Sequence, residues 1–337
     1  MITLTYGSFA QHNAQILTGF NILTKGKCKI ASFPDETLPT CVVLADIDGR
    51  RIAYDTCDGY FHAGAIGTDE RYHALSEKTE ILYKRDFNSA VDPKDLLYVG
   101  KIKPLGLNYF CYDNRIKKLY YPGFRLIKNF LKEVVGLSCD VNWKRFESDV
   151  VTSHYSCDVL FLTRLWNPDA AEVENQKIAE ERKRVNSMRI SVIHEMRRRY
   201  GNSAVCGVVD DSYARRTAPE LIISDVTKKA SYLKIMKEAK IAVTSLGLHE
   251  SNGWRTGEYM AAGRSVVMEE PYYEIPFAKK GENWLEYTNA NECIEAIEEL
   301  LSDETKRQQM EKANREFYVM HLRPDQLIKD TLADMGK

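Results

Sequence analysis

Residues able to do chemistry concentrate in one short stretch, 245–263, where two glutamates flank a turn rich in Gly, Ser and Asn. The stretch reads as the end of an apolar strand, a turn, and a helix that Gly263 closes. Backbone N–H groups at the start of such a helix, around residues 252–255, lack partners within the helix and suit a phosphate. Glu250 and Glu258 would instead accept hydrogen bonds from hydroxyls. Phosphate donors beside hydroxyl acceptors indicate a nucleotide-sugar site.

Alternating strands and helices must position this stretch in the second half of the chain. Strand-like apolar runs occur at 158–163, 203–209, 241–245 and 265–268, and helical patterns at 170–200, 227–239, 253–262, 289–301 and 304–318. This alternation indicates βαβ units and a parallel sheet. The stretch 245–263 would then follow the carboxyl end of a parallel strand, which is where open α/β sheets bind ligands.

The first half of the chain gives weaker patterns. Strand-like runs at 40–47 and 50–54 surround Asp48-Gly49, a strong signal for a hairpin. Asp46 and Asp48 form a D-x-D pattern that could hold a divalent metal, but the turn explains them and is favoured. Further strands are expected at 78–83 and 101–108.

The residues around the two glutamates resemble a known family. Glu250-x7-Glu258, with Gly253 between them and Gly263 after them, is similar to the E-x7-E signature of retaining GT-B glycosyltransferases. This resemblance implies an α/β fold with two Rossmann-like domains, each a parallel sheet with helices on both faces. It also implies that Glu250 lies beside the donor sugar as a catalytic residue and that Glu258 holds the ribose hydroxyls.

The same resemblance extends to the diphosphate. Arg164 follows an apolar strand, as does the arginine that contacts the diphosphate in this family. The family's lysine a few residues later is missing, so Arg255 and Lys177 are candidates for the second cation. The expected donor-binding residues are therefore Arg164, His249, Ser251, Asn252, Gly253, Arg255 and Glu258. His249 is equally compatible with a loop histidine that has no role in binding.

The length of 337 residues suggests two domains. We expect an acceptor-side Rossmann-like domain over 1–110 and a linker or helical insertion over 111–155. A nucleotide-sugar-binding domain would span 156–322. Residues 323–337 would form a helix that packs back on the N-terminal domain.

Polar residues after the strands of the first half are candidates for the acceptor side. Asp58 and His62 could bind the acceptor or act as a catalytic base, although a solvated turn explains them equally well. The run 84–86 (Lys-Arg-Asp) follows a strand and could face a cleft, but surface charge is the favoured interpretation.

Composition excludes several classes of protein. The 47 Lys and Arg nearly balance the 48 Asp and Glu, which argues against a globally basic nucleic-acid-binding protein. No apolar run approaches the ~18 residues of a membrane span, and no signal peptide is evident, so a cytoplasmic location is expected. The eight Cys are scattered and the seven His form no cluster, so we expect no metal and no cofactor.

The resemblance, taken with these patterns, implies a glycosyltransferase that moves a sugar from a nucleotide-sugar donor to a glycan or lipid-linked acceptor. By resemblance it would retain the anomeric configuration and act in surface polysaccharide biosynthesis. The amphipathic segment 121–137 could contact the inner face of an anionic membrane, although core packing is the commoner role of such a segment. A GT-B-type sugar-nucleotide epimerase and a non-catalytic binding or scaffold module are the alternatives.

Overall fold

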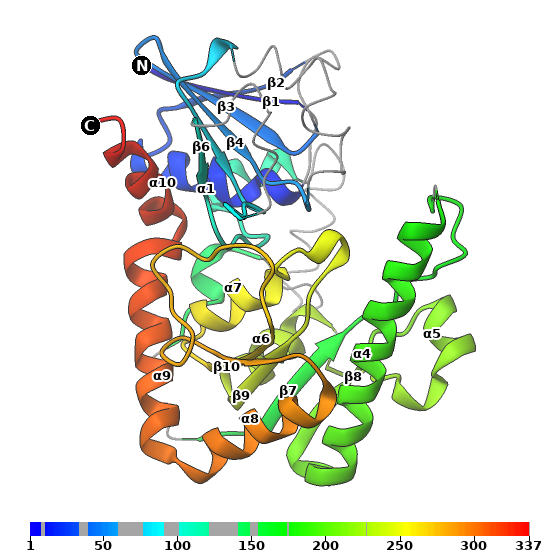
Figure 1. Ribbon diagram of the computed structural model, residues 1–337. Helices are drawn as coiled ribbons and strands as arrows, with labels where there is room; N and C mark the ends of the chain where they lie inside the picture. The colour runs from blue at the N-terminus through cyan, green and yellow to red at the C-terminus, as the bar shows by residue number, and fades with distance from the viewer. Residues whose placement is uncertain are drawn as a thin grey trace. The chain divides into compact units, whose positions relative to one another are not determined.

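The structure is a computed structural model that divides into two compact units (Figure 1). It describes residues 1–7, 11–33, 40–59, 77–90, 101–120, 141–148, 154–173, 175–226 and 228–336. Unit 1 comprises Met1–Arg145, Tyr272–Phe277 and Val319–Lys337, and unit 2 comprises Phe146–Pro271 and Ala278–Tyr318. Each unit contains its own β-sheet with helices packed on it, so the predicted α/β class is confirmed.

Unit 2 contains a five-stranded sheet in which every pair of neighbours is parallel. Its strands, in chain order, are β7 Cys157–Thr163, β8 Ala204–Val208, β9 Ala239–Thr244, β10 Ser265–Glu269 and β11 Leu285–Tyr287. The spatial order β11-β10-β9-β7-β8 places β8 on one side of β7 and β9 on the other. The strand order therefore reverses between β7 and β9, and the carboxyl ends of these two strands flank the switch point at which such sheets bind ligands.

Helices cover both faces of this sheet, as the sequence predicts. They are α4 Gln176–Tyr200, α5 Ser212–Thr217, α6 Lys229–Lys237, α7 Trp254–Ala261, α8 Ala290–Ser302 and α9 Glu304–Phe317. Helices α4 and α8 pack together over one face, where Val192, Ile193 and Ile297 are fully buried against strand residues. Helices α6, α7 and α9 pack over strands β7, β9 and β10 from the other face. Burial on both faces explains why the strands read as continuous apolar runs.

Unit 1 contains a six-stranded sheet of mixed direction, with strand order β2-β1-β3-β4-β5-β6. Its strands are β1 Ile2–Tyr6, β2 Lys29–Ser32, β3 Val42–Ile47, β4 Arg50–Asp55, β5 Ile81–Lys84 and β6 Ile102–Pro104. The pairs β1–β2, β4–β5 and β5–β6 are parallel, so the sheet is mainly parallel, and the exception is β3, which is antiparallel to both β1 and β4. The reason is the hairpin: Asp48 and Gly49 have φ of +55° and +88°, a tight turn that returns β4 directly along β3.

Two helices from opposite ends of the sequence cross on one face of the unit 1 sheet. They are α1 Ala14–Leu23 and α10 Pro324–Ala333 (Figure 1, blue and red). A side chain at Gly19 of α1 would place its Cβ 2.1 Å from the carbonyl oxygen of Pro324, so the crossing requires glycine. The hydroxyl of Tyr54 on β4 lies 2.8 Å from Thr331 Oγ1 on α10.

Short helical turns complete the chain as described. They are η1 Gln11–Asn13, η2 Asn114–Leu119, η3 Trp143–Arg145, η4 Gly201–Ser203, η5 Pro219–Leu221, η6 Leu248–Glu250 and the π-helical turn η7 Tyr318–Leu322. The predicted amphipathic segment 121–137 lies outside the described residues. None of the described helices has both the length and the apolar character that a membrane span needs.

Candidate functional site

The loop after β9 is a compact turn at the switch point of unit 2. The N–H of Gly247 donates to the Ser251 carbonyl at 2.8 Å, which closes the loop on itself. The N–H of Leu246 donates to Oε2 of the buried Glu269, at the end of β10, at 2.9 Å. A Cβ at position 247 would lie 2.5 Å from Ser251 Oγ, so a larger residue there would displace that hydroxyl. The loop therefore has a defined shape before any ligand binds.

His249 and Glu250 adopt backbone angles that are costly for residues other than glycine. Their φ values are +59° and +57°, both in the left-handed region. Helix α4 holds both residues: Glu181 accepts a hydrogen bond from the backbone N–H of His249, and Arg184 Nη2 donates to Glu250 Oε1 at 2.5 Å. The Glu250 side chain stays 37% exposed. The strained backbone therefore holds the Glu250 carboxylate in a defined, partly solvated position. Backbone strain of this kind is concentrated at functional sites.

Arg189 of α4 ties together the loops that follow β7 and β9. Its Nη1 donates to the Arg164 carbonyl at 2.7 Å, Nη2 to the Leu246 carbonyl at 2.7 Å and Nε to Ser245 Oγ at 2.9 Å. Burial lowers the pKa of the Arg189 guanidinium to about 10. The charge of Glu269 opposes this shift, while the charges of Arg255 and Arg164 add to it. Three arginines therefore converge at this edge of the sheet.

Arg164, the predicted diphosphate-binding residue, lies directly after β7 with its side chain exposed. Its guanidinium stacks 5.4 Å from the ring centre of Trp166, and Arg182 lies over the same ring at 5.8 Å. Asn186 of α4 bonds both the N–H and the carbonyl of Trp166, at 2.8 and 2.7 Å. Helix α4 therefore fixes the aromatic support of Arg164.

Arg255, one of the two predicted second cations, lies in the first turn of α7. That helix starts after Gly253 without a side-chain cap. The Arg255 guanidinium lies 5.0 Å from the ring centre of Tyr232, and its buried Nη1 atom has no hydrogen-bond acceptor among the described residues. Ser251 and Asn252 are both buried beside the helix start. A cation and uncapped N–H groups thus occupy the same place, which suits an anion.

Glu258, the predicted ribose-binding residue, is buried between α7 and α6. Lys229 Nζ donates to its Oε1 at 3.1 Å, and the hydroxyl of Tyr232 donates to its Oε2. Burial, followed by the Glu258 charge, raises the pKa of Tyr232 well above its ordinary value, so the tyrosine remains a donor. A carboxylate has about four acceptor positions, so Glu258 can accept further bonds from hydroxyls.

The structure gathers the predicted donor residues into unit 2, around the carboxyl ends of β7 and β9. Arg164 and Arg255 are near enough to act on Arg189, and Glu250 and Arg184 both act electrostatically on Glu269. Sequence reasoning missed Arg184, Arg189 and Glu269, which hold the loops from α4 and β10.

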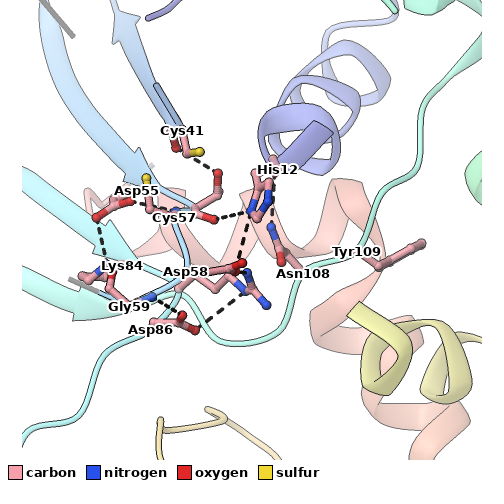
Figure 2. A network of polar contacts seen from close by, with 12 residues as sticks. His12, Cys41, Asp55, Cys57, Asp58, Gly59, Lys84, Asp86, Asn108 and Tyr109 are labelled. Carbon is pink, nitrogen blue, oxygen red and sulfur yellow. Dashed lines mark hydrogen bonds and ion pairs between the residues drawn. The ribbon is translucent and has the colours of Figure 1, made fainter. Parts of the chain in front are cut away.

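A second polar cluster lies in unit 1, at the carboxyl ends of the paired strands β4 and β5 (Figure 2). Lys84 Nζ lies 2.9 Å from Asp55 Oδ2, and both side chains are completely buried. Lys84 also donates to the Gly59 carbonyl at 2.9 Å, and the Gly59 N–H donates to Asp86 Oδ2 at 2.6 Å. The prediction that 84–86 is surface charge is wrong, because β5 is an interior strand between β4 and β6.

Asp58, a predicted catalytic candidate, belongs to this cluster (Figure 2). It forms an ion pair with the buried Arg85, and its Oδ1 lies 3.8 Å from Nδ1 of His12. The His12 Nδ1 atom also lies 3.0 Å from the Thr56 carbonyl, which favours the tautomer with its proton on Nδ1 and basic character at Nε2. The other candidate, His62, lies outside the described residues. His12 is therefore the titratable partner of Asp58 that sequence reasoning missed.

The D-x-D carboxylates serve the hairpin turn. Asp46 accepts hydrogen bonds from the Gly49 N–H at 3.0 Å and from Arg51 Nε at 3.1 Å, and Asp48 pairs with the N-terminal amine. In the part of the chain that the structure describes, no group of three or more His, Cys, Asp or Glu gathers as metal ligands.

Comparison with known families gives one match. Residues 183–333 match the family model described as "Glycosyl transferase-like". The matched residues include the loop 245–253 and helix α7. A search of curated proteins finds no match.

Several solved structures are similar to this chain at low identity. Anabaena HepE in complex with UDP is 12% identical, with 78% of this chain and 66% of HepE covered and a TM-score of 0.44. Sucrose-phosphate synthase from Thermosynechococcus elongatus is 15% identical, with 79% of this chain and 61% of the synthase covered and a TM-score of 0.41. The pneumococcal O-GlcNAc transferase GtfA in complex with UDP and GlcNAc is 11% identical, with 77% of this chain and 54% of GtfA covered and a TM-score of 0.37. The chain thus spans less than two thirds of the length of each.

Proposed function

We propose that this protein is a glycosyltransferase that moves a sugar from a nucleotide-sugar donor to a hydroxyl of a glycan or lipid-linked acceptor. The observation that carries the proposal is the match of residues 183–333 to the glycosyl transferase-like family model. The matched residues include the loop that follows β9, Arg189 and Arg255, whereas Arg164 precedes them in the sequence. The geometry agrees, because cations and hydroxyl acceptors are combined at the switch point of a parallel sheet.

The donor would lie across the carboxyl ends of β7 and β9. Its diphosphate would bind Arg164, Arg255 and the uncapped start of α7, where positive charge is concentrated. Glu258 would accept hydrogen bonds from the ribose hydroxyls, and Glu250 would lie beside the transferred sugar. His249, Ser251, Asn252 and Gly253 would shape the pocket between the sugar and the diphosphate.

The chemistry requires stabilisation of a leaving diphosphate. The bond from the anomeric carbon to the diphosphate oxygen breaks, and the electron pair goes to that oxygen. The acceptor oxygen forms the new bond and loses its proton. Arg164, Arg255 and the N–H groups of α7 would stabilise the developing negative charge, and this arrangement requires no metal or cofactor. We further propose that the anomeric configuration is retained.

The acceptor would bind on the side of unit 1 that carries His12 and Asp58. A histidine with its proton on Nδ1 can accept one from an acceptor hydroxyl at Nε2, and Asp58 together with Arg85 would orient it. We propose surface polysaccharide biosynthesis in the cytoplasm as the context. Contact of segment 121–137 with the inner face of the membrane would bring the enzyme to a lipid-linked acceptor.

A calorimetric panel of nucleoside diphosphates and nucleotide sugars, beginning with UDP and UDP-glucose, tests the donor site. Glu258→Gln is expected to weaken binding of the hit by about 1.5–3 kcal/mol, because a charge-assisted bond to the ribose is lost. The matched control is Glu311→Gln. Glu311 is also buried, accepts bonds from a tyrosine hydroxyl and a cation, and lies on α9 outside the switch-point loops. Equal losses in the two variants would contradict the ribose assignment.

Product analysis separates transfer from the alternative reactions. With donor alone, a transferase at most hydrolyses it slowly, whereas an epimerase converts its sugar. Glu250→Gln is expected to reduce turnover by a larger factor than it reduces donor affinity, and a fully active variant would remove Glu250 from the reacting centre. No binding across the whole panel would favour a scaffold instead.

A further inference from the structure

Arg189 is a buried cation whose hydrogen bonds all go to uncharged acceptors. These are two backbone carbonyls and one hydroxyl, each 2.7–2.9 Å away. Within the described residues the Arg189 guanidinium forms no ion pair, whereas the buried Arg182 pairs with Glu172 at 3.2 Å and the buried Arg307 with Glu311 at 3.0 Å. A buried charge without a counter-charge is unfavourable, and a bound anion would relieve this cost.

The surroundings of Arg189 add positive charge instead of neutralising it. The charges of Arg164 and Arg255 both act on its guanidinium. The buried Glu269 is the main opposing charge, and one oxygen of that carboxylate already accepts the Leu246 N–H. The charge of the buried Glu258 also acts on Arg255, so three arginines face two buried carboxylates and positive charge remains in excess at the switch point. A diphosphate, with a negative charge on each phosphate, matches this excess.

The three hydrogen bonds of Arg189 also determine local geometry. The guanidinium is planar and rigid, so it fixes the carbonyl of Arg164 relative to residues 245 and 246. The hydrogen bond to the Arg164 carbonyl fixes the backbone at Arg164 and therefore the point from which its side chain extends. The other two set the start of the loop that leads into α7 and Arg255. One side chain thereby links both proposed phosphate-binding segments.

We propose that Arg189 is a positioning residue for the donor diphosphate. It holds the loops after β7 and β9 so that Arg164, Arg255 and the start of α7 face one diphosphate, and its own charge strengthens the attraction. This inference rests on the proposed function, because it assigns the diphosphate of the donor to that site.

The test compares Arg189→Met with Arg264→Met, after circular dichroism has shown which variants fold. Arg264 is a matched control because it is also buried and also donates to two backbone carbonyls, those of Ala262 and Ala239. It lies just before β10, at the opposite edge of the sheet. The probes are inorganic pyrophosphate, UDP and the uncharged nucleoside uridine, measured by calorimetry at low and high salt.

Arg189→Met is expected to lose about 10- to 100-fold in affinity for pyrophosphate and UDP, while its affinity for uridine stays unchanged. The salt dependence of UDP binding should also decrease, and Arg264→Met should bind all three probes like wild type. A merely structural role would reduce uridine binding as well, or would affect the Arg264 variant equally. Either outcome would overturn the inference, as would a wild-type protein that does not bind pyrophosphate.

Arg189→Lys carries the test if Arg189→Met does not fold. Lysine keeps the charge but cannot reach three acceptors in a fixed fork, so pyrophosphate affinity should fall by a smaller factor. Undiminished affinity in this variant would overturn the positioning role. A wild-type protein that binds pyrophosphate but no nucleoside diphosphate would leave the anion site standing and refute the proposed donor.

Discussion

Replacement of Asp86 by asparagine should change how the stability of unit 1 depends on pH. The Asp86 side chain is completely buried, and its Oδ2 accepts the Gly59 N–H at 2.6 Å. Burial raises the pKa of Asp86 from its ordinary value of 3.8 to about 6. The charge of Arg85 opposes this shift, and the charge of Asp58 adds to it.

The sign of this pH dependence follows from which state, native or unfolded, binds the Asp86 proton more tightly. Between about pH 4 and pH 6 the native state holds the Asp86 proton and the unfolded state has released it, so the free energy of unfolding falls as pH rises through this window. This loss of stability is absent below the pKa of Asp86 in the unfolded chain and complete above its pKa in the native protein. The shift from 3.8 to about 6 corresponds to a cost on the order of 3 kcal/mol at pH 7. An asparagine side chain at this position would mimic the protonated acid and avoid that cost.

Scanning calorimetry of wild type and Asp86→Asn from pH 4.5 to 7.5 measures this difference. We expect the variant to gain stability relative to wild type as pH rises, with most of the change complete near pH 7. Asp46→Asn is the control: a hydrogen bond from the Gly49 N–H lowers the pKa of the exposed Asp46 carboxyl, so its difference from wild type should be flat over this range. A flat difference for Asp86→Asn, or one that grows toward acid pH, would refute the reasoning.

Two further predictions concern the stability of unit 1. Asp55→Asn removes the charged partner that lies 2.9 Å from the buried Lys84, so it should lower the free energy of unfolding by about 3–5 kcal/mol. The control, Glu80→Gln, breaks the half-exposed pair with Arg50 between the same strands and should lower it by less than about 1 kcal/mol. Equal losses of stability in urea titrations of the two variants would contradict this prediction. Gly19→Ala forces a Cβ against the Pro324 carbonyl and should cost about 1–3 kcal/mol, with faster proteolysis of α10; an unchanged melting temperature would show that the two helices separate without cost.

The strands of unit 2 were predictable because they are buried on both faces. A strand covered on both sides is apolar at successive positions, as residues 159–162 and 241–243 are. Because the loop at 245–253 directly follows the second of these runs, the sequence alone places it at the carboxyl end of a strand.

Arg189 could have been found from the periodicity of α4. Val185, Val192 and Met196 form the buried stripe of that helix, and Arg189 occupies a position within the stripe. A charged residue inside an apolar stripe must be buried and must find acceptors there. The same test would have singled out Arg182 and Asn186, which hold the segment after β7.

The polar cluster of unit 1 could not be predicted from local patterns. His12 lies just before α1 and Asp58 lies just after β4, so the two approach because α1 packs on the sheet, with Phe20 against Tyr54 of β4. The burial of Lys84 depends on β6 covering the outer edge of β5, and no periodicity in a four-residue strand reveals that. Both facts depend on strand order, which single-sequence patterns determine poorly in a mixed sheet.

The assignment of α10 to unit 1 has a consequence for the order in which the chain folds during synthesis. The polypeptide passes from one unit to the other after residues 145, 271, 277 and 318. Helix α1 emerges from the ribosome among the first residues, yet the surface around Gly19 is covered only when Pro324 and the residues after it have emerged. Unit 2 can therefore complete its sheet first, and unit 1, although it begins at the N-terminus, completes its core last.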